Sequence, residues 1–188
     1  PGIELRPGFF MFAIVLAALD RSGSVLPILC AMAVHELAHV VMMLACGGQV
    51  RRLTLRFADL QIAASGLGYR QELLSALAGP LVNLICGAAF CMQRPSFAAY
   101  SLMLGIYNLL PVWPLDGGRM IRCVLLARLP ITQAEHISEI VSFAACAVLL
   151  LIGVFLTFFR KSGLWPLGTA AYLTVRLLML ARRTDAVQ

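Results

Sequence analysis

The chain has 188 residues, of which 61% are hydrophobic and only 13% are charged. About a quarter of the residues of a soluble domain are charged, so this composition excludes a water-soluble globule and indicates an integral membrane protein. The net charge of +6 would suit nucleic-acid binding in another composition, but here we assign it to loops beside membrane spans and expect no nucleic acid partner.

The predicted elements are membrane-spanning helices, each of which needs about 20 mostly apolar residues. Three windows meet this need without a charged residue: 73–92, 97–115 and 140–159. The window 25–46 is equally apolar apart from three ionisable residues, and two weaker windows lie at 7–19 and 164–180. We therefore expect an all-α polytopic membrane protein of about six spans, with residues 1–188 forming one transmembrane domain.

Basic residues between the spans predict their orientation, because cytoplasmic loops collect Arg and Lys. If six spans alternate, eleven basic residues fall on one side of the membrane and four on the other. Both termini are then cytoplasmic, and the second and fourth spans run parallel and end on the cytoplasmic side. We expect a multi-pass protein of a bacterial inner membrane, with its active site toward the cytoplasm.

The second predicted span contains His35-Glu36-Leu37-Ala38-His39, an HExxH motif. Residues four apart share one face of a helix, so both imidazoles can approach one metal ion while Glu36 lies beside it. An ionisable side chain at bilayer depth costs about 3 kcal/mol, so three of them within five residues require a partner or a function. The motif therefore predicts a metal site.

Between the second and third spans, apolar and polar residues alternate over 53–57 and again over 60–62. Alternation around a two-residue break is typical of a small β-hairpin. An irregular amphipathic loop fits the pattern equally well.

The third predicted span is rich in small residues, which allow neighbouring helices to approach closely. Its polar residue, Asn83, has two interpretations: a hydrogen bond across helices, which we favour, or support of the metal site. The fifth and sixth spans carry no recognisable chemistry, and either form inert scaffold or gate the entry of a substrate.

A catalytic zinc usually takes three protein ligands, so the two histidines need a partner elsewhere. Asp116 ends the fourth predicted span, and Pro111 and Pro114 should kink or unwind this helix between Tyr107 and Pro114. Because the second and fourth spans run parallel, the Asp116 carboxylate would lie toward the same membrane face as His39. The alternative is a solvated Asp-Gly turn that ends the helix.

Three segments together resemble the site-2 protease family of intramembrane zinc metalloproteases. They are His35 to His39, Ala78-Gly79-Pro80-Leu81-Val82-Asn83, and Asn108 to Gly118 with its Leu115-Asp116-Gly117 core. The proline-rich third segment is most similar to the subgroup of the stage IV sporulation protein FB. Many members of that subgroup carry a C-terminal pair of CBS modules; this sequence stops at Gln188, so we expect a member without them.

The resemblance implies one zinc ion on His35, His39 and Asp116, with Glu36 as general base. It also implies membrane-tethered protein substrates, such as a transcription-factor or sigma-factor precursor, and leaves room for a regulatory membrane protein. The hairpin region and Asn108 would help to hold the substrate. The Asn108 amide either donates to the developing oxyanion or bridges two helices, and both interpretations remain open.

Two other classes of function fit some of these features. A membrane metal-ion transporter would place polar residues along a path across the bilayer, whereas this sequence concentrates them near one depth with a glutamate beside them. A catalytically inactive membrane adaptor would not need an intact HExxH motif and Asp116. An intramembrane zinc metalloendopeptidase is therefore the preferred prediction.

Overall fold

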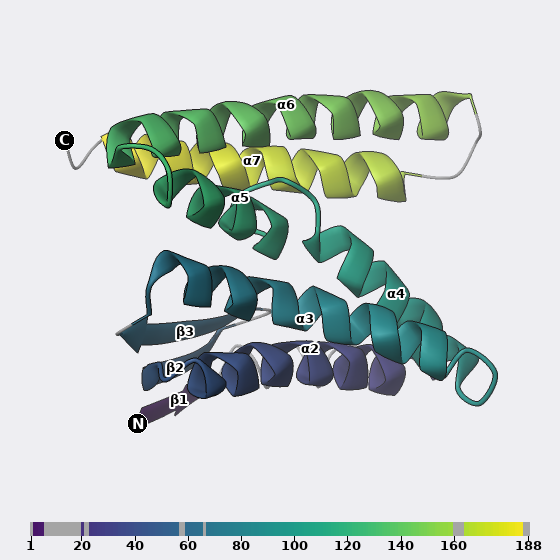
Figure 1. Ribbon diagram of the computed structural model, residues 1–188. Coiled ribbons are helices and arrows are strands. Elements are labelled where there is room, and N and C mark those ends of the chain that lie inside the picture. The colour runs from purple at the N-terminus through teal and green to yellow at the C-terminus, as the bar shows by residue number, and fades with distance from the viewer. Residues whose placement is uncertain are drawn as a thin grey trace. The chain divides into compact units, whose positions relative to one another are not determined.

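The computed structural model describes residues 2–5, 20, 23–56, 59–65, 67–159 and 164–185 (Figure 1). The chain divides into two compact units, Pro1–Asn108 and Leu109–Gln188, and each unit is described by itself.

The N-terminal unit combines a small sheet with three helices. The sheet contains β1 (Gly2–Leu5), β2 (Gln49–Arg56) and β3 (Asp59–Ser65) in the order β1-β2-β3. β2 and β3 pair antiparallel where the alternation predicted a hairpin, with Leu53 opposite Ile62. β1, which sequence analysis missed, pairs parallel with β2. β2 is therefore central, and β3 forms one edge of the sheet.

The helices of this unit are α2 (Val25–Ala45), α3 (Tyr69–Ala89) and α4 (Pro95–Asn108). The Asp20 carboxylate accepts hydrogen bonds from the backbone N–H groups of Ser24 and Val25 at 3.1 and 2.9 Å, which satisfies donors at the start of α2. α2 ends where Gly47 adopts a φ of 80°, a left-handed conformation that suits glycine at a helix C-terminus.

The three helices run in alternating directions. His35 and His39 of α2 contact Asn83 and Ser75 of α3 in reverse order, so α2 and α3 are antiparallel and lie side by side (Figure 1). α3 and α4 are also antiparallel, because Gly87 faces Leu102 while Gly105 faces Pro80. α2 and α4 are therefore parallel, which confirms the relative direction predicted for the second and fourth spans.

Glycines allow α3 and α4 to pack closely. A Cβ atom added at Gly105 would lie 3.0 Å from the carbonyl oxygen of Pro80, and one added at Gly87 would lie 2.6 Å from Cδ2 of Leu102. Larger residues would push the helices apart, as expected for small residues between membrane helices. The last turn of α4 consequently packs against α3 next to Gly79, at the level of the two histidines.

The C-terminal unit begins with a non-helical segment, 109–115, which is followed by α5 (Asp116–Leu126), α6 (Ile131–Phe158) and α7 (Trp165–Asp185). The predicted fourth span ran to Leu115, but the helix ends at Asn108, because Pro111 and Pro114 lack the backbone donors that would continue it. Asp116 therefore begins a helix and does not end one, which corrects the prediction. Sequence analysis missed α5 because Arg119 and Arg122 interrupt its apolar residues, so that no apolar window covers it.

α6 packs against α7 (Figure 1). α6 begins at Ile131, earlier than the predicted 140, because its first turns are polar and continue the helix beyond the apolar window. The predicted sixth span, 164–180, lies within α7 apart from its first residue, Leu164.

Among the described residues, three helices are long and apolar enough to cross a membrane: α2, α3 and α6. α7 contains a shorter apolar stretch, Pro166–Leu180. Large apolar side chains stay exposed along these helices, including Leu37 at 61% and Leu151 at 71%, as expected for a surface in contact with lipid. The chain is thus a membrane protein. The first predicted span, 7–19, lies outside the described residues.

Candidate metal centre

The two histidines of the HExxH motif lie on the buried stripe of α2. Ala31, His35, His39 and Met43 recur every four residues and are the buried residues of this helix. His35 and His39 are only 4% and 5% exposed. Their Nε2 atoms lie 3.1 Å apart, and the rings meet edge to face. Both imidazoles therefore direct one nitrogen toward the same point, as the spacing predicted.

The other nitrogen of each ring contacts α3. His39 Nδ1 lies 2.6 Å from the backbone carbonyl oxygen of Ser75. Because a carbonyl can only accept, this nitrogen carries the ring proton, and a neutral His39 keeps a lone pair on Nε2. The Ser75 hydroxyl in turn donates to the backbone oxygen of His39 at 3.3 Å. His35 Nδ1 lies 3.2 Å from Nδ2 of Asn83.

This arrangement fits a zinc site. Two nitrogens held at about 2.0–2.1 Å from a tetrahedral zinc ion lie about 3.3 Å apart, close to the 3.1 Å between the Nε2 atoms of His35 and His39. Histidine ligands usually bond to a carbonyl or another polar group through their second nitrogen, and both rings have such a partner here. The residues present therefore suit the metal that the motif predicted.

Gly79 of α3 makes room for both rings. A Cβ atom added there would lie 2.6 Å from Cε1 of His39 and 2.9 Å from Cε1 of His35, and it would also collide with Nε2 of His39. Any side chain at this position must displace the imidazoles. Sequence analysis assigned Gly79 only to helix packing and to the family motif, whereas the structure gives it a direct place beside the metal-binding atoms.

Glu36 follows His35 on α2 and is half-buried. It lies on the flank of the stripe that carries the two histidines, since adjacent residues of a helix point about 100° apart. Its carboxylate can therefore lie beside the metal-binding pair without being one of the two facing ligands.

Asp116, in the C-terminal unit, is the first residue of α5 and is 7% exposed. The Arg119 guanidinium lies beside its carboxylate, with Nη1 3.5 Å from Oδ1. Gly117 and Gly118 pack against the preceding segment, because a Cβ at Gly118 would lie 2.5 Å from the backbone nitrogen of Trp113. The two glycines thus allow α5 to pack closely on the segment that precedes it.

The segment before Asp116 is fastened to α6. The backbone N–H of Trp113 donates to the Ser142 hydroxyl oxygen at 3.0 Å, and this hydroxyl donates to the backbone oxygen of Ser138 at 2.9 Å. Ser142 is 1% exposed, so both bonds are shielded from solvent. Sequence analysis missed this link, because a serine inside an apolar helix carries no sign of its partner.

Asn108 is the last residue of α4, and its side-chain amide donates to the carbonyl oxygen of Leu104 at 3.1 Å. This bond satisfies one carbonyl at the helix end and uses one of the two amide hydrogens. The predicted oxyanion role of Asn108 thus stays a prediction.

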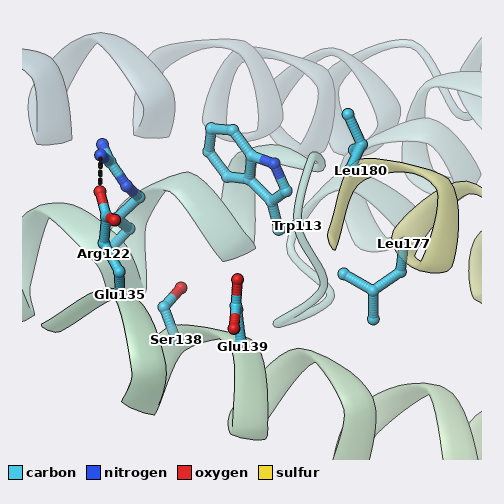
Figure 2. A pocket seen from close by; sticks show the side chains of 7 residues that line it. All are labelled: Trp113, Arg122, Glu135, Ser138, Glu139, Leu177 and Leu180. Carbon is cyan, nitrogen blue, oxygen red and sulfur yellow. Dashed lines mark hydrogen bonds and ion pairs between the residues drawn. The ribbon is translucent and has the colours of Figure 1, made fainter. Parts of the chain in front are cut away.

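A cavity of about 270 Å³ lies within the C-terminal unit (Figure 2). Arg122 of α5 contacts Glu135 of α6 at 2.8 Å, and its guanidinium lies 5.8 Å from the centroid of the Trp113 ring. The remaining lining residues come from α6 and α7: Ser138, Glu139, Leu177 and Leu180. Arg122 thereby joins α5 to α6 beside the segment that leads to Asp116.

Residues 94–152 match peptidase family M50. The chain is 27% identical over 172 residues to a zinc metalloprotease of Methanocaldococcus jannaschii, a match that covers 81% of this chain and 51% of the relative. It is 25% identical over 169 residues to stage IV sporulation protein FB of Bacillus subtilis, covering 83% of this chain and 58% of the relative. The chain thus spans a little over half the length of these curated relatives.

The fold also resembles that of a solved structure, a site-2 protease from Methanocaldococcus jannaschii. The TM-score is 0.66 at 20% sequence identity, and the match covers 94% of this chain and 89% of the other. The similarity extends over nearly the whole of both chains and shows a common fold.

Proposed function

We propose that the chain is a member of peptidase family M50 and acts as an intramembrane zinc metalloendopeptidase that cleaves membrane-tethered proteins. The observation that carries the proposal is the buried histidine pair: the Nε2 atoms of His35 and His39 lie 3.1 Å apart, and the opposite nitrogen of each ring contacts α3. Such a pair in an apolar helix serves metal binding far better than packing.

We assign the third ligand to Asp116. Each of the three residues offers one atom of a kind that zinc prefers, and each is buried. The last turn of α4 packs beside Gly79, so the chain leaves Asn108 at the level of the histidines. The eight residues from there to Asp116 can extend over about 25 Å, which gives the carboxylate ample reach.

In the proposed reaction, His35, His39 and Asp116 would hold zinc, which when bound would polarise the scissile carbonyl and make water more acidic. Glu36 accepts a proton from the attacking water and delivers it to the nitrogen of the leaving amine. The second amide hydrogen of Asn108 can donate to the oxyanion while the first stays bonded to Leu104.

The substrate must be extended, because a helix hides its carbonyls in hydrogen bonds. β2 follows α2 closely in the chain and contacts it, which places the sheet near the His39 end of that helix (Figure 1). β1 and β3 occupy both sides of β2, so among the described strands only β1 and β3 have an outer edge, and we assign the pairing surface to that of β3. Backbone pairing there would present the substrate as an added strand.

Proline substitutions along β3 test this pairing. Backbone N–H groups of an edge strand alternate between the partner strand and the free side, so of Gln61→Pro and Ile62→Pro only one removes an outward donor. That variant should cleave a tethered substrate at least tenfold more slowly while its zinc content stays at one per chain. The other variant reports general damage to the sheet. Full cleavage by both variants would rule out strand addition at β3.

We further assign the chain six spans in a bacterial inner membrane, with the catalytic end toward the cytoplasm. The excess of basic residues on one side of the predicted spans supports this orientation. Its substrates would be membrane-associated precursors of transcription or sigma factors, under the control of a further membrane protein.

The Glu36→Gln variant tests the activity directly. The amide cannot accept the proton but keeps the size of the side chain, so cleavage of single-span candidate substrates should fall to background while zinc binding persists. Glu139→Gln, a change at a half-buried carboxylate in the C-terminal unit, serves as a matched control with unchanged cleavage. Undiminished cleavage in the Glu36 variant would overturn its assignment as general base.

A further inference from the structure

Asn83 is a fully buried polar residue beside the histidine pair. It lies on α3, one turn after Gly79, and is 0% exposed. Its Nδ2 atom lies 3.2 Å from Nδ1 of His35. Within the described part of the chain, its Oδ1 atom is buried with no hydrogen-bond partner. A buried carboxamide that is half unsatisfied is costly, so its placement against a metal-binding ring calls for a reason.

The chemistry of His35 supplies that reason. A neutral imidazole that binds a metal through Nε2 must carry its proton on Nδ1, so Nδ1 becomes a donor and needs an acceptor. The Nδ2 group of Asn83 is itself a donor and cannot serve. The oxygen and nitrogen of a carboxamide have nearly the same shape, so a half-turn of the Asn83 amide brings Oδ1 to the same place without disturbing the packing.

The two histidines then have equivalent support. The Ser75 carbonyl oxygen contacts Nδ1 of His39 at 2.6 Å, and the Asn83 carboxamide contacts Nδ1 of His35 at 3.2 Å. Both supporting groups come from α3, on opposite sides of Gly79. The support of His39 is a backbone atom that substitution cannot remove, whereas that of His35 is a side chain that can be changed.

We propose that Asn83 is a positioning residue whose carboxamide oxygen accepts a hydrogen bond from Nδ1–H of His35. This bond fixes the ring orientation and the tautomer that leaves Nε2 free for a divalent metal ion. The inference rests on the proposed zinc site and adds to it a supporting group. It also distinguishes Asn83 from an ordinary interhelical hydrogen bond, because an interhelical role would require only that the two helices stay joined.

Zinc affinity tests the proposal without reference to proteolysis. The dissociation constant for zinc would be measured on the purified full chain by competition with a chromophoric chelator. Asn83→Leu keeps a similar volume but removes the acceptor, and should weaken zinc binding about 10–100-fold, the usual effect of losing such a partner. Asn83→Asp keeps an acceptor oxygen in the same place and should bind zinc at least as tightly as the parent chain.

Ser101→Ala is the matched control. Ser101 lies on α4, is also 0% exposed, and its hydroxyl likewise has no hydrogen-bond partner in the described ranges. Its removal changes a buried polar group that makes no hydrogen bond to His35, so zinc affinity should not change. Cobalt substituted for zinc gives a second readout, since only Asn83→Leu should shift the visible absorption of the bound ion.

The outcomes separate the two proposals. If Asn83→Leu binds zinc as tightly as the parent, or if Asn83→Asp is weakened as much as Asn83→Leu, Asn83 does not position His35 and the inference is wrong while the zinc site stands. If the parent chain itself binds no zinc, the proposed function is wrong and the inference is wrong with it.

Discussion

The histidine pair of the N-terminal unit and the Asp116 segment of the C-terminal unit are held in place in different ways. His35 and His39 sit on one continuous helix, and α3 orients both rings through a backbone carbonyl and an amide. Asp116 follows seven non-helical residues, and its position depends on glycine packing and on the bonds between Trp113 and α6. The spacing of the two histidines is therefore encoded locally on one helix, whereas the position of Asp116 depends on contacts with other segments.

The largest effect should come from Gly79→Ala, which changes the space beside the histidine pair. The added methyl group would overlap the His39 ring and lie 2.9 Å from Cε1 of His35, so both imidazoles must move. Displacing a catalytic group by about 1 Å costs roughly a hundredfold in rate, so cleavage should fall by at least that factor and zinc content should drop. Both are measured on the purified full chain.

Gly168→Ala is the matched control for this change. Gly168 lies in α7, and an added Cβ atom there would meet nothing within 4 Å. Zinc content and cleavage should stay at the parent level. An intact, active Gly79→Ala protein would show that the rings do not need this space.

A smaller effect is expected from Ser142→Ala, which removes the hydrogen bond between the segment before Asp116 and α6. The substitution leaves the Trp113 N–H without its acceptor, at a cost of about 1–3 kcal/mol. If part of this cost appears as loosening of the Asp116 segment, zinc affinity falls by up to about tenfold, because 1.4 kcal/mol corresponds to a factor of ten. Chelator competition measures the change, and unaltered affinity would show that the link to α6 does not hold Asp116.

The smallest effect is expected from Glu135→Gln, which removes the ion pair with Arg122. Both side chains are partly exposed, at 32% and 42%, so the pair contributes roughly 0–1 kcal/mol. Thermal unfolding should shift by a few degrees at most. The shift should shrink further at high salt, where exposed pairs are screened. A large loss of stability would mean that this pair contributes more to the packing of α5 on α6 than its exposure allows.

Sequence reasoning succeeded where geometry follows from spacing. The four-residue interval in HExxH fixes a common helix face, and the alternation of successive spans gave the relative direction of α2 and α4 correctly. Pro111 and Pro114 predicted that the fourth span would unwind, but they did not predict that Asp116 begins a new helix. α5 escaped prediction because a short amphipathic helix with Arg119 and Arg122 has no apolar window.

The supporting contacts could not be predicted in the same way. Asn83 in an apolar helix fits an interhelical hydrogen bond as well as a bond to a ligand, and only the register of α2 against α3 places it beside His35. Ser142 and the Gly79 contact with the rings also depend on register. Register between helices is set by packing of many small side chains, which a single sequence does not specify.

X-ray absorption at the zinc edge of the purified full chain tests the central claim most directly. The account predicts one zinc per chain, with two imidazole nitrogens at about 2.0–2.1 Å, further oxygen ligands, and loss of one oxygen ligand in Asp116→Ala. A chain that holds no zinc, or zinc bound by thiolate sulfur at about 2.3 Å, would contradict it.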